Sequence, residues 1–376
     1  MGRHGAHEIK KPEKEDMTAE ELPREENVSE EKETPKKKEK KKMSKGTKTL
    51  LIIACVILAV AVLMAGTVLV LMKIGQNALT DDGSNVDLSN KADVLENGMI
   101  RYNGKLYRYN DEVTTILLMG IDERAKTEFD GVYGDGNQSD VNVLLVMDPV
   151  NEKMTLLAIS RDAMCELKVL DEEGNYLGPT TGQLALSYCY GDGAERSCEL
   201  TCDAVSGILR GISVPAYGSI YMNGIADLVD LVGGVEITAS KTFGSFVEGQ
   251  KVTLKGDLTE KYIRPREHTT EGNNERMERQ HQVLLALVNK ALSSAKNDPF
   301  SIPELYRGVN ENVTTNIDVS MMAYLAKTAV GLDFDNTIHN VEGESVLGEK
   351  NYAEFNIDED ALFDTIVELY YLPVEG

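Results

Sequence analysis

Residues 141–159 read VNVLLVMDPVNEKMTLLAI, and the expected architecture follows from this stretch. The run from Val141 to Met147 is almost wholly apolar, as expected for a strand that is covered on both faces. Asp148 to Lys153 is turn material, and Met154 to Ile159 is a second apolar run with strand character. We therefore expect the two strands to pair antiparallel as a hairpin in the protein interior.

Strands and helices alternate on both sides of this hairpin. An Asn-Gly pair within Gly98–Asn110 predicts a further hairpin, and Thr114–Met119 predicts a strand. The other expected strands are Ala216–Met222 and Val235–Thr238, and the expected helices are Gln183–Tyr190, Leu200–Leu209, Gly224–Leu231 (stopped by Gly233-Gly234), Met321–Leu332 and Glu359–Tyr371. This alternation predicts an α/β fold, a three-layer α/β/α sandwich with a mixed, largely antiparallel central sheet.

The N-terminal part of the chain predicts a disordered tail followed by a membrane anchor. Residues 1–48 have almost no large apolar side chains and cannot form a core. Leu50–Met72 then runs without a charge for long enough to cross a bilayer. Lysines crowd its first flank, so the positive-inside rule places the N-terminus in the cytoplasm. A cleaved signal peptide is the alternative, but the apolar run is long and starts late.

The expected organisation is a cytoplasmic tail (1–48), a transmembrane anchor (49–73), a linker with a hairpin (74–110) and an extracytoplasmic domain (111–376). The net charge is −23, from 39 Lys+Arg and 62 Asp+Glu. The tail holds 14 basic and 12 acidic residues, so the negative charge lies downstream of it. A domain this acidic should not bind nucleic acid by general electrostatics. Anion binding would need locally concentrated positive charge.

Lys261–Gln282, KYIRPREHTTEGNNERMERQHQ, provides such a concentration. Arg264 and Arg266 flank a proline, and on an extended segment they would share one face. Arg276, Arg279, Gln280, Val283 and Leu287 then follow at helical spacing, with Arg276 expected in the first helical turn. Cations are unfavourable at a helix N-terminus, so these arginines suggest a bound phosphate. The alternative is a solvated face paired with neighbouring glutamates.

Oxygen ligands complete the expected site. Cys/His spacing typical of zinc sites, a Gly-x-Ser-x-Gly elbow and a Walker loop are all absent from the sequence. Asp122 follows one predicted strand and Asp140 precedes another, so together they could hold Mg²⁺, unless they are ordinary loop acids. Ser160-Arg161-Asp162 stands at the end of a third strand. A metal ion and guanidiniums are the groups that stabilise a diphosphate, which predicts phosphoryl transfer outside the cell from a membrane-borne donor.

The order of these motifs resembles the LytR-CpsA-Psr family. The resemblance rests on GID, SD, SRD, QLALSYCYGDG, YMNGIADLVDLVGGVEI, YIRPRE and NNERMERQHQ, and it covers about Thr114–Leu292. It implies a membrane-anchored α/β/α enzyme of Gram-positive bacteria. Such an enzyme moves an anionic glycopolymer, such as teichoic acid or capsule, from an undecaprenyl-diphosphate carrier to peptidoglycan.

The resemblance also implies roles for individual residues. Asp122 and Asp140 match the Mg²⁺ ligands, and Val283, Leu284 and Leu287 match the lining of a tunnel for the lipid tail. The matches to the diphosphate clamp are Arg161, Arg264, Arg266 and Arg276, with Arg279 and Gln280 beside it.

The chain departs from the family pattern at three places. Asn273 stands where the family usually has Asp, Ser160 where it often has Pro, and Gln183-Leu184-Ala185 where it has Lys-x-Asn. Asn273 cannot act as a general base, so Asp162 is the candidate base unless it only orients Arg161 or Arg266. Two other functions use the same groups: a regulator that binds polyprenyl diphosphates without turnover, and a polyprenyl-diphosphate hydrolase.

Overall fold

The computed structural model describes residues 64–95, 98–123, 131–133, 137–265, 270–297, 312–348 and 351–374. A helix covers residues 64–79, where the predicted anchor ends. The predicted tail and most of the predicted anchor lie outside the described residues. Within the described ranges, no helix combines the length and the apolar character that a membrane crossing requires. The anchor therefore stays a prediction from the sequence.

Six strands form the central sheet in the order β12-β9-β4-β5-β6-β13. Their bounds are Val313–Thr315 (β12), Ala216–Tyr221 (β9), Thr114–Ile121 (β4), Ser139–Asp148 (β5), Lys153–Ile159 (β6) and Asp333–Asn340 (β13). The hairpin expected from the apolar stretch is confirmed, because β5 and β6 pair antiparallel. The pairs β4–β5 and β12–β9 are antiparallel as well, whereas β4–β9 and β13–β6 are parallel. The sheet is therefore mixed, as expected.

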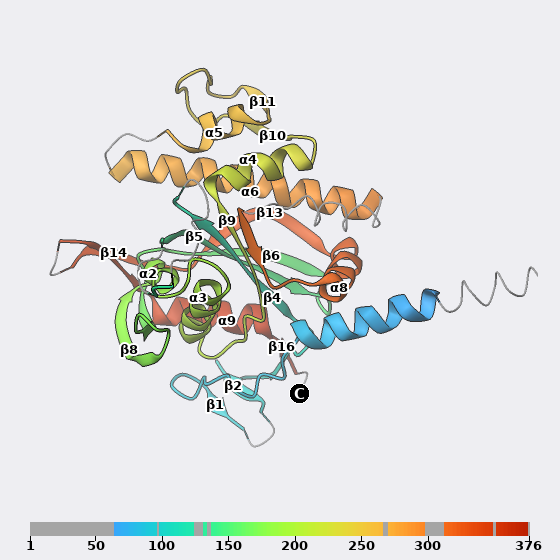
Figure 1. Cartoon of the computed structure of the whole chain (residues 1–376). Coiled ribbons are helices and arrows are strands. Elements are labelled where there is room, and N and C mark those ends of the chain that lie inside the picture. The colour runs from blue at the N-terminus through green and yellow to red at the C-terminus, as the bar shows by residue number, and fades with distance from the viewer. Residues whose placement is uncertain are drawn as a thin grey trace, which may run out of the picture. The chain divides into compact units, whose positions relative to one another are not determined.

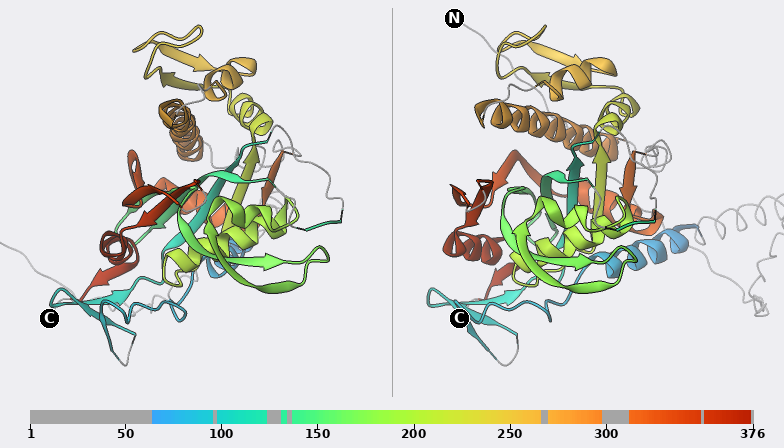
Figure 2. Two further views of the ribbon diagram at one scale, coloured as in Figure 1. Left: turned by 90° about the vertical axis from the view of Figure 1, so that its left-hand side faces the viewer. Right: turned by 60° about the vertical axis from the view of Figure 1, so that its left-hand side comes forward.

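Helices cover both faces of this sheet (Figures 1 and 2). One face carries α2 (Ala185–Cys189), α3 (Glu195–Ile208) and α9 (Glu359–Tyr370); the other carries α6 (Thr270–Asn297) and α8 (Val319–Val330). Leu117 and Leu144 pack into the first core, whereas Ile116 and Val143, their neighbours along the strands, pack on the opposite face. This alternation follows from the two-residue period of a strand. The result is a three-layer α/β/α arrangement.

Four smaller sheets accompany the central one within the described residues. One joins β1 (Asp93–Val94), β2 (Ile100–Tyr102), β3 (Lys105–Tyr109) and β16 (Tyr371–Pro373). Its β2–β3 hairpin confirms the Asn-Gly prediction, since Asn103 and Gly104 both have the positive φ of a type I′ turn. The others are the hairpins β7–β8 (Met164–Leu170 and Tyr176–Gln183), β10–β11 (Val235–Thr238 and Lys251–Leu254) and β14–β15 (Gly343–Leu347 and Ala353–Ile357).

Two predictions about the arginine stretch are wrong. Arg264 does not lie on an extended segment: it caps helix α5 (Asp257–Ile263) with helical backbone angles, and Pro265 marks the end of this helix. Acidic Asp257 and Glu260 in the first turn favour that helix. Arg276 is not in the first turn of α6, because α6 begins at Thr270 and includes residues that were expected to form a turn. Arg266 lies outside the described residues.

Candidate active site

A β-bulge brings the two expected metal ligands to one edge of the sheet. Asp122 directly follows β4, and Asp140 is the second residue of β5. The pairing register shifts here, because Gly120 pairs with Val141 whereas Ile121 pairs with Ser139. Asp140 is thus the extra residue of the bulge, a feature that re-aims a side chain and is common beside active sites.

Arg276 lies between the two carboxylates. Its Nη1 is 3.2 Å from Oδ2 of Asp122, and its Nη2 is 3.3 Å from Oδ2 of Asp140. Arg161, just after β6, contacts the other oxygen of Asp140 through its own Nη1. Asp122, Arg276, Asp140 and Arg161 therefore form a continuous series of ion pairs, which we call the ion-pair chain. Asp140 and Arg276 have only 7% and 9% of their side chains exposed, so a low local dielectric strengthens these pairs.

Two buried polar atoms on α6 have no hydrogen-bond partner among the described residues. They are Nε of Arg276 and Oε1 of Gln280. An unsatisfied buried polar group costs about 1–3 kcal/mol, and native proteins seldom tolerate it without a ligand or a water. Arg276 and Gln280 are one turn apart on the same helix, so the two side chains lie on one face of α6.

Arg264 lies beside the same sheet edge. It donates a hydrogen bond to Oδ1 of Asn223 at 3.2 Å and pairs with Glu260 at 2.9 Å. Asn223 belongs to α4 (Met222–Leu231), whose first N–H donates to the carbonyl of Glu123, next to Asp122. Helices α4 and α5 thus bring Arg264 near the ion-pair chain.

Arg279 has a different environment from the other arginines. Its Nε donates to the carbonyl of Tyr262 at 2.8 Å, and an Nη donates to the carbonyl of Pro265. Its guanidinium also lies 4.4 Å from the ring centre of Phe243, a cation–π contact. Burial lowers the pKa of Arg279. These contacts tie α6 to the end of α5, the segment that carries Arg264.

Asp162 lies on the other side of Arg161. The Nε of Arg161 is 3.6 Å from Oδ1 of Asp162, and the amide of Gln183 donates to the same oxygen at 3.0 Å. Burial raises the pKa of Asp162, an effect that the charge of Arg161 opposes. A carboxylate with a raised pKa is suited to accept a proton, because it is a stronger base than an ordinary aspartate.

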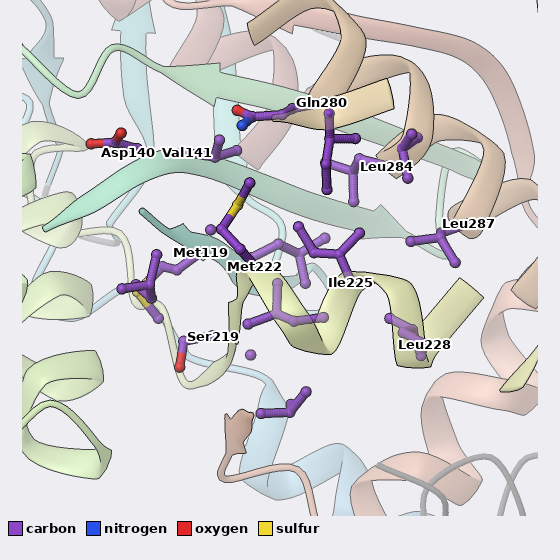
Figure 3. A pocket seen from close by; sticks show the side chains of 18 of the residues that line it. Met119, Asp140, Val141, Ser219, Met222, Ile225, Leu228, Gln280, Leu284 and Leu287 are labelled. Atoms are coloured by element: carbon purple, nitrogen blue, oxygen red, sulfur yellow. The ribbon is translucent and has the colours of Figure 1, made fainter. Parts of the chain in front are cut away.

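An apolar cavity of about 210 Å³ extends from the ion-pair chain between the sheet and helices α4 and α6. Figure 3 shows Asp140 and Gln280 at one end of this cavity and Leu228 and Leu287 at the other. Side chains of α6 face side chains of α4 across it. The three residues expected to line a lipid tunnel, Val283, Leu284 and Leu287, all line this cavity. The site therefore combines a charged head region with an apolar tail region.

Asp122 and Asp140 are the described carboxylates that could hold a metal ion at this site. Within the described part of the chain, no group of three or more His, Cys, Asp or Glu side chains could hold a metal ion. Asp122 and Asp140, however, approach adjacent nitrogens of one guanidinium. Two convergent carboxylates fit Mg²⁺, which commonly takes one or two carboxylates and completes its shell with phosphate oxygens and water.

The structure brings most of the predicted site residues together. Asp122, Asp140, Arg161 and Arg276 form the ion-pair chain, Asp162 contacts Arg161, and Gln280 lines the cavity with Asp122 and Asp140. Arg264 contacts Asn223 of α4 and Glu260 instead. Arg266 and the side chain of Asn273 lie outside the described residues. The sequence analysis missed Gln183 as a contact of Asp162, and it missed the lining residues of α4. The apolar spacing of Ile225 and Leu228 on the predicted helix Gly224–Leu231 was the available signal for the latter.

Comparison with known proteins identifies one family. A sequence model described as the LytR_cpsA_psr family matches residues 74–368. The chain is 29% identical over 244 residues to a polyisoprenyl-teichoic acid–peptidoglycan teichoic acid transferase TagU of Enterococcus faecalis, covering 64% of this chain and 71% of that protein. It is 28% identical over 246 residues to a protein of the same name from Oceanobacillus iheyensis, covering 64% and 69%.

A solved structure has a similar fold. The crystal structure of Bacillus subtilis TagV matches 68% of this chain and 96% of that one, with a TM-score of 0.52 and 24% identity. At this level of identity, the likeness concerns the fold alone. The mixed central sheet and its covering helices are therefore shared with a known protein.

Proposed function

Since the chain belongs to the LytR-CpsA-Psr family, we propose that it transfers an anionic glycopolymer from an undecaprenyl-diphosphate carrier to peptidoglycan. The transferase class is that of its named relatives. The observation that carries the proposal is the position of the ion-pair chain at one end of an apolar cavity. An amphiphile with an anionic head and an isoprenoid tail matches both parts, because guanidiniums bind phosphate oxygens and the cavity walls exclude water.

In the proposed reaction, the acceptor hydroxyl attacks the phosphorus atom that carries the glycopolymer. The bond from this phosphorus to the bridging oxygen breaks, and polyprenyl phosphate leaves with that oxygen and the electron pair. The acceptor proton passes to Asp162, a carboxylate with a raised pKa that contacts Arg161 of the ion-pair chain. Arg276 and Arg161 stabilise the negative charge that develops on the leaving phosphate. Bound Mg²⁺, held by Asp122 and Asp140, would add positive charge at the diphosphate.

Three other residues support this arrangement in the proposal. Gln280 would bind the diphosphate through the NH₂ group of its side-chain amide, because phosphate oxygens only accept hydrogen bonds. Arg264 would bind at the rim. Arg279 would position the end of α5 rather than contact the donor, because its N–H groups bind backbone carbonyls.

The test is a transfer assay with the full chain in detergent micelles. The reaction contains a polyprenyl-diphosphate-linked glycan, peptidoglycan oligomers and Mg²⁺, and mass spectrometry identifies the products. We expect a glycan-phosphate-muropeptide adduct together with polyprenyl monophosphate. Free glycan phosphate in place of the adduct would make the protein a hydrolase. Intact donor that stays bound would make it a non-turnover regulator.

We further propose that the domain lies outside the cytoplasmic membrane, with residues 1–48 in the cytoplasm. The lysine-rich flank before the apolar run supports this orientation. Protease treatment of intact protoplasts should remove the domain and leave the tail protected. Protection of the domain until the cells are lysed would refute the orientation.

A further inference from the structure

We propose that Gln183 is a positioning residue that holds Asp162 in the orientation needed to accept the proton of the acceptor hydroxyl. The inference rests on the proposed function, and it adds a residue of this chain to it. Gln183 ends strand β8, and its Nε2 donates to Oδ1 of Asp162 at 3.0 Å and to the carbonyl of Ala353 at 2.6 Å. Both protons of the amide are therefore used.

The partners fix the orientation of this amide. A carboxylate oxygen and a carbonyl oxygen only accept hydrogen bonds, so the NH₂ group must face both of them. A flipped amide would place its own oxygen against two acceptors, which is repulsive. Gln183 consequently links Asp162 of one loop to Ala353 of strand β15 in a single geometry.

Strand β15 also holds the backbone of Asp162. The N–H of Phe355 donates to the carbonyl of Asp162 at 2.8 Å, and Ala163 forms a parallel β-bridge with Phe355. Both the side chain and the main chain of Asp162 are thus anchored to the same strand, one through Gln183 and one directly. The hairpin β14–β15 therefore supports the loop after β6 that carries Arg161 and Asp162, although the hairpin is about 190 residues further along the chain.

The same contacts leave one oxygen of Asp162 available. Gln183 and Arg161 both approach Oδ1, and within the described residues no partner reaches Oδ2. The side chain as a whole is 31% exposed, and in the proposal the acceptor hydroxyl approaches Oδ2, the oxygen that Gln183 and Arg161 leave open. Gln183 therefore both fixes the carboxylate and determines which oxygen faces the substrate.

Because Gln183 is uncharged, it does not change the basicity of Asp162 by a charge of its own. The charged group that faces Asp162 is Arg161, from its own loop, whereas β8 and β15 contribute an uncharged amide and backbone groups. A cation at position 183 would stabilise the carboxylate and weaken it as a base, whereas a second carboxylate would do the opposite. Changing the charge at this position should therefore shift the pH profile in a predictable direction.

The experiment compares Gln183→Leu, Gln183→Lys and Gln183→Glu with Thr181→Leu, a matched control at an exposed position of the same strand. The full chain is assayed for kcat and donor KM across pH. We expect Gln183→Leu to lose at least about tenfold in kcat with little change in donor KM, since positioning acts on the chemical step. Gln183→Lys should recover part of kcat, because an ammonium can donate to both partners but weakens the base, and its acid limb should move down by about one pH unit. Gln183→Glu should move that limb up, and Thr181→Leu should behave as wild type.

Two results would overturn the positioning role: wild-type kcat in Gln183→Leu, or equal acid limbs in the Lys and Glu variants. The carboxyl resonance of Asp162, followed by NMR with ¹³C-labelled aspartate, gives a readout that needs no turnover. If Gln183→Lys lowers the pKa of Asp162 but the wild type shows no transfer, the contact between Gln183 and Asp162 is supported and the proposed function is rejected. An unshifted resonance beside active wild-type enzyme would reject the role of Gln183 and retain the function.

Discussion

Gly218 offers a way to fill the cavity without disturbing the fold. It lies on β9 opposite Leu118 of β4, and both residues line the cavity. A Cβ added at Gly218 would meet no heavy atom within 4 Å, and the residue does not have a left-handed backbone conformation. Replacing it by Ala, Val or Leu therefore adds one, three or four carbons where part of the lipid tail would lie.

The size of the effect follows from the carbons that are displaced. Each buried CH₂ contributes about 0.8 kcal/mol of transfer free energy. If every added carbon displaces one tail carbon, donor binding weakens by up to about 0.8, 2.4 and 3.2 kcal/mol in the three variants. These values correspond to increases of roughly 4-, 50- and 200-fold in Kd. For Gly218→Ala the free energy of unfolding should change by less than about 1 kcal/mol, because the added Cβ meets no heavy atom within 4 Å.

Titration with a full-length polyprenyl-diphosphate donor measures this series directly. A donor analogue with a methyl group in place of the isoprenoid tail should bind wild type and all variants equally, because it does not enter the cavity. Gly207→Leu is the matched control, since Gly207 is exposed on α3 and also has open space around it. Unchanged affinity for the full-length donor throughout the series, or equal weakening of the tail-less analogue, would refute the assignment of the cavity to the tail.

Three further predictions concern the charged groups. Arg276→Lys cannot bridge Asp122 and Asp140, so turnover at saturating donor should fall by about 100-fold; more than a tenth of wild-type turnover would contradict the role of the ion-pair chain. Asp122→Asn should raise the Mg²⁺ concentration for half-maximal transfer at least about tenfold, and an unchanged Mg²⁺ titration would remove this residue from the metal site. Arg279→Met keeps bulk but loses the bonds to two carbonyls, so urea unfolding should show a loss of about 2–3 kcal/mol; a loss below about 0.5 kcal/mol would mean that these bonds contribute little.

The parts of the protein that the sequence predicts correctly are those with a strong local pattern. Strands β5 and β6 are buried on both faces, so their apolar runs are uninterrupted and easily recognised. The helical spacing of Val283 and Leu287 predicts helix α6 for the same reason, whereas their position in the lining of a lipid tunnel was implied by the family resemblance. An apolar run or an apolar helical period can be recognised in the sequence because the positions that face the core carry apolar residues.

The parts that escaped prediction depend on tertiary contacts. The bulge at Asp140 arises from pairing with β4, and nothing in the local sequence marks it. Helix α5 was missed because Pro265 outweighed the acidic residues of its first turn. Hairpin β7–β8 carries mostly exposed or half-buried side chains, so it lacks the apolar alternation of a half-buried strand, and its contact between Gln183 and Asp162 could not be anticipated.

Helix α6 runs from the charged end of the site to the far end of the cavity. It carries Arg276 and Gln280 at the charged end and Leu287 at the far end of the cavity, and Leu292 beyond it packs against the core around Met147. Arg276 and Leu292 are about 24 Å apart along one rigid rod, at 1.5 Å per residue. Leu284, Val288 and Leu292 pack α6 against the sheet along this length, so the charged end and the far end of the cavity keep a fixed separation. In the proposed function, this fixed separation would set the position of the diphosphate relative to the part of the lipid tail that fills the cavity.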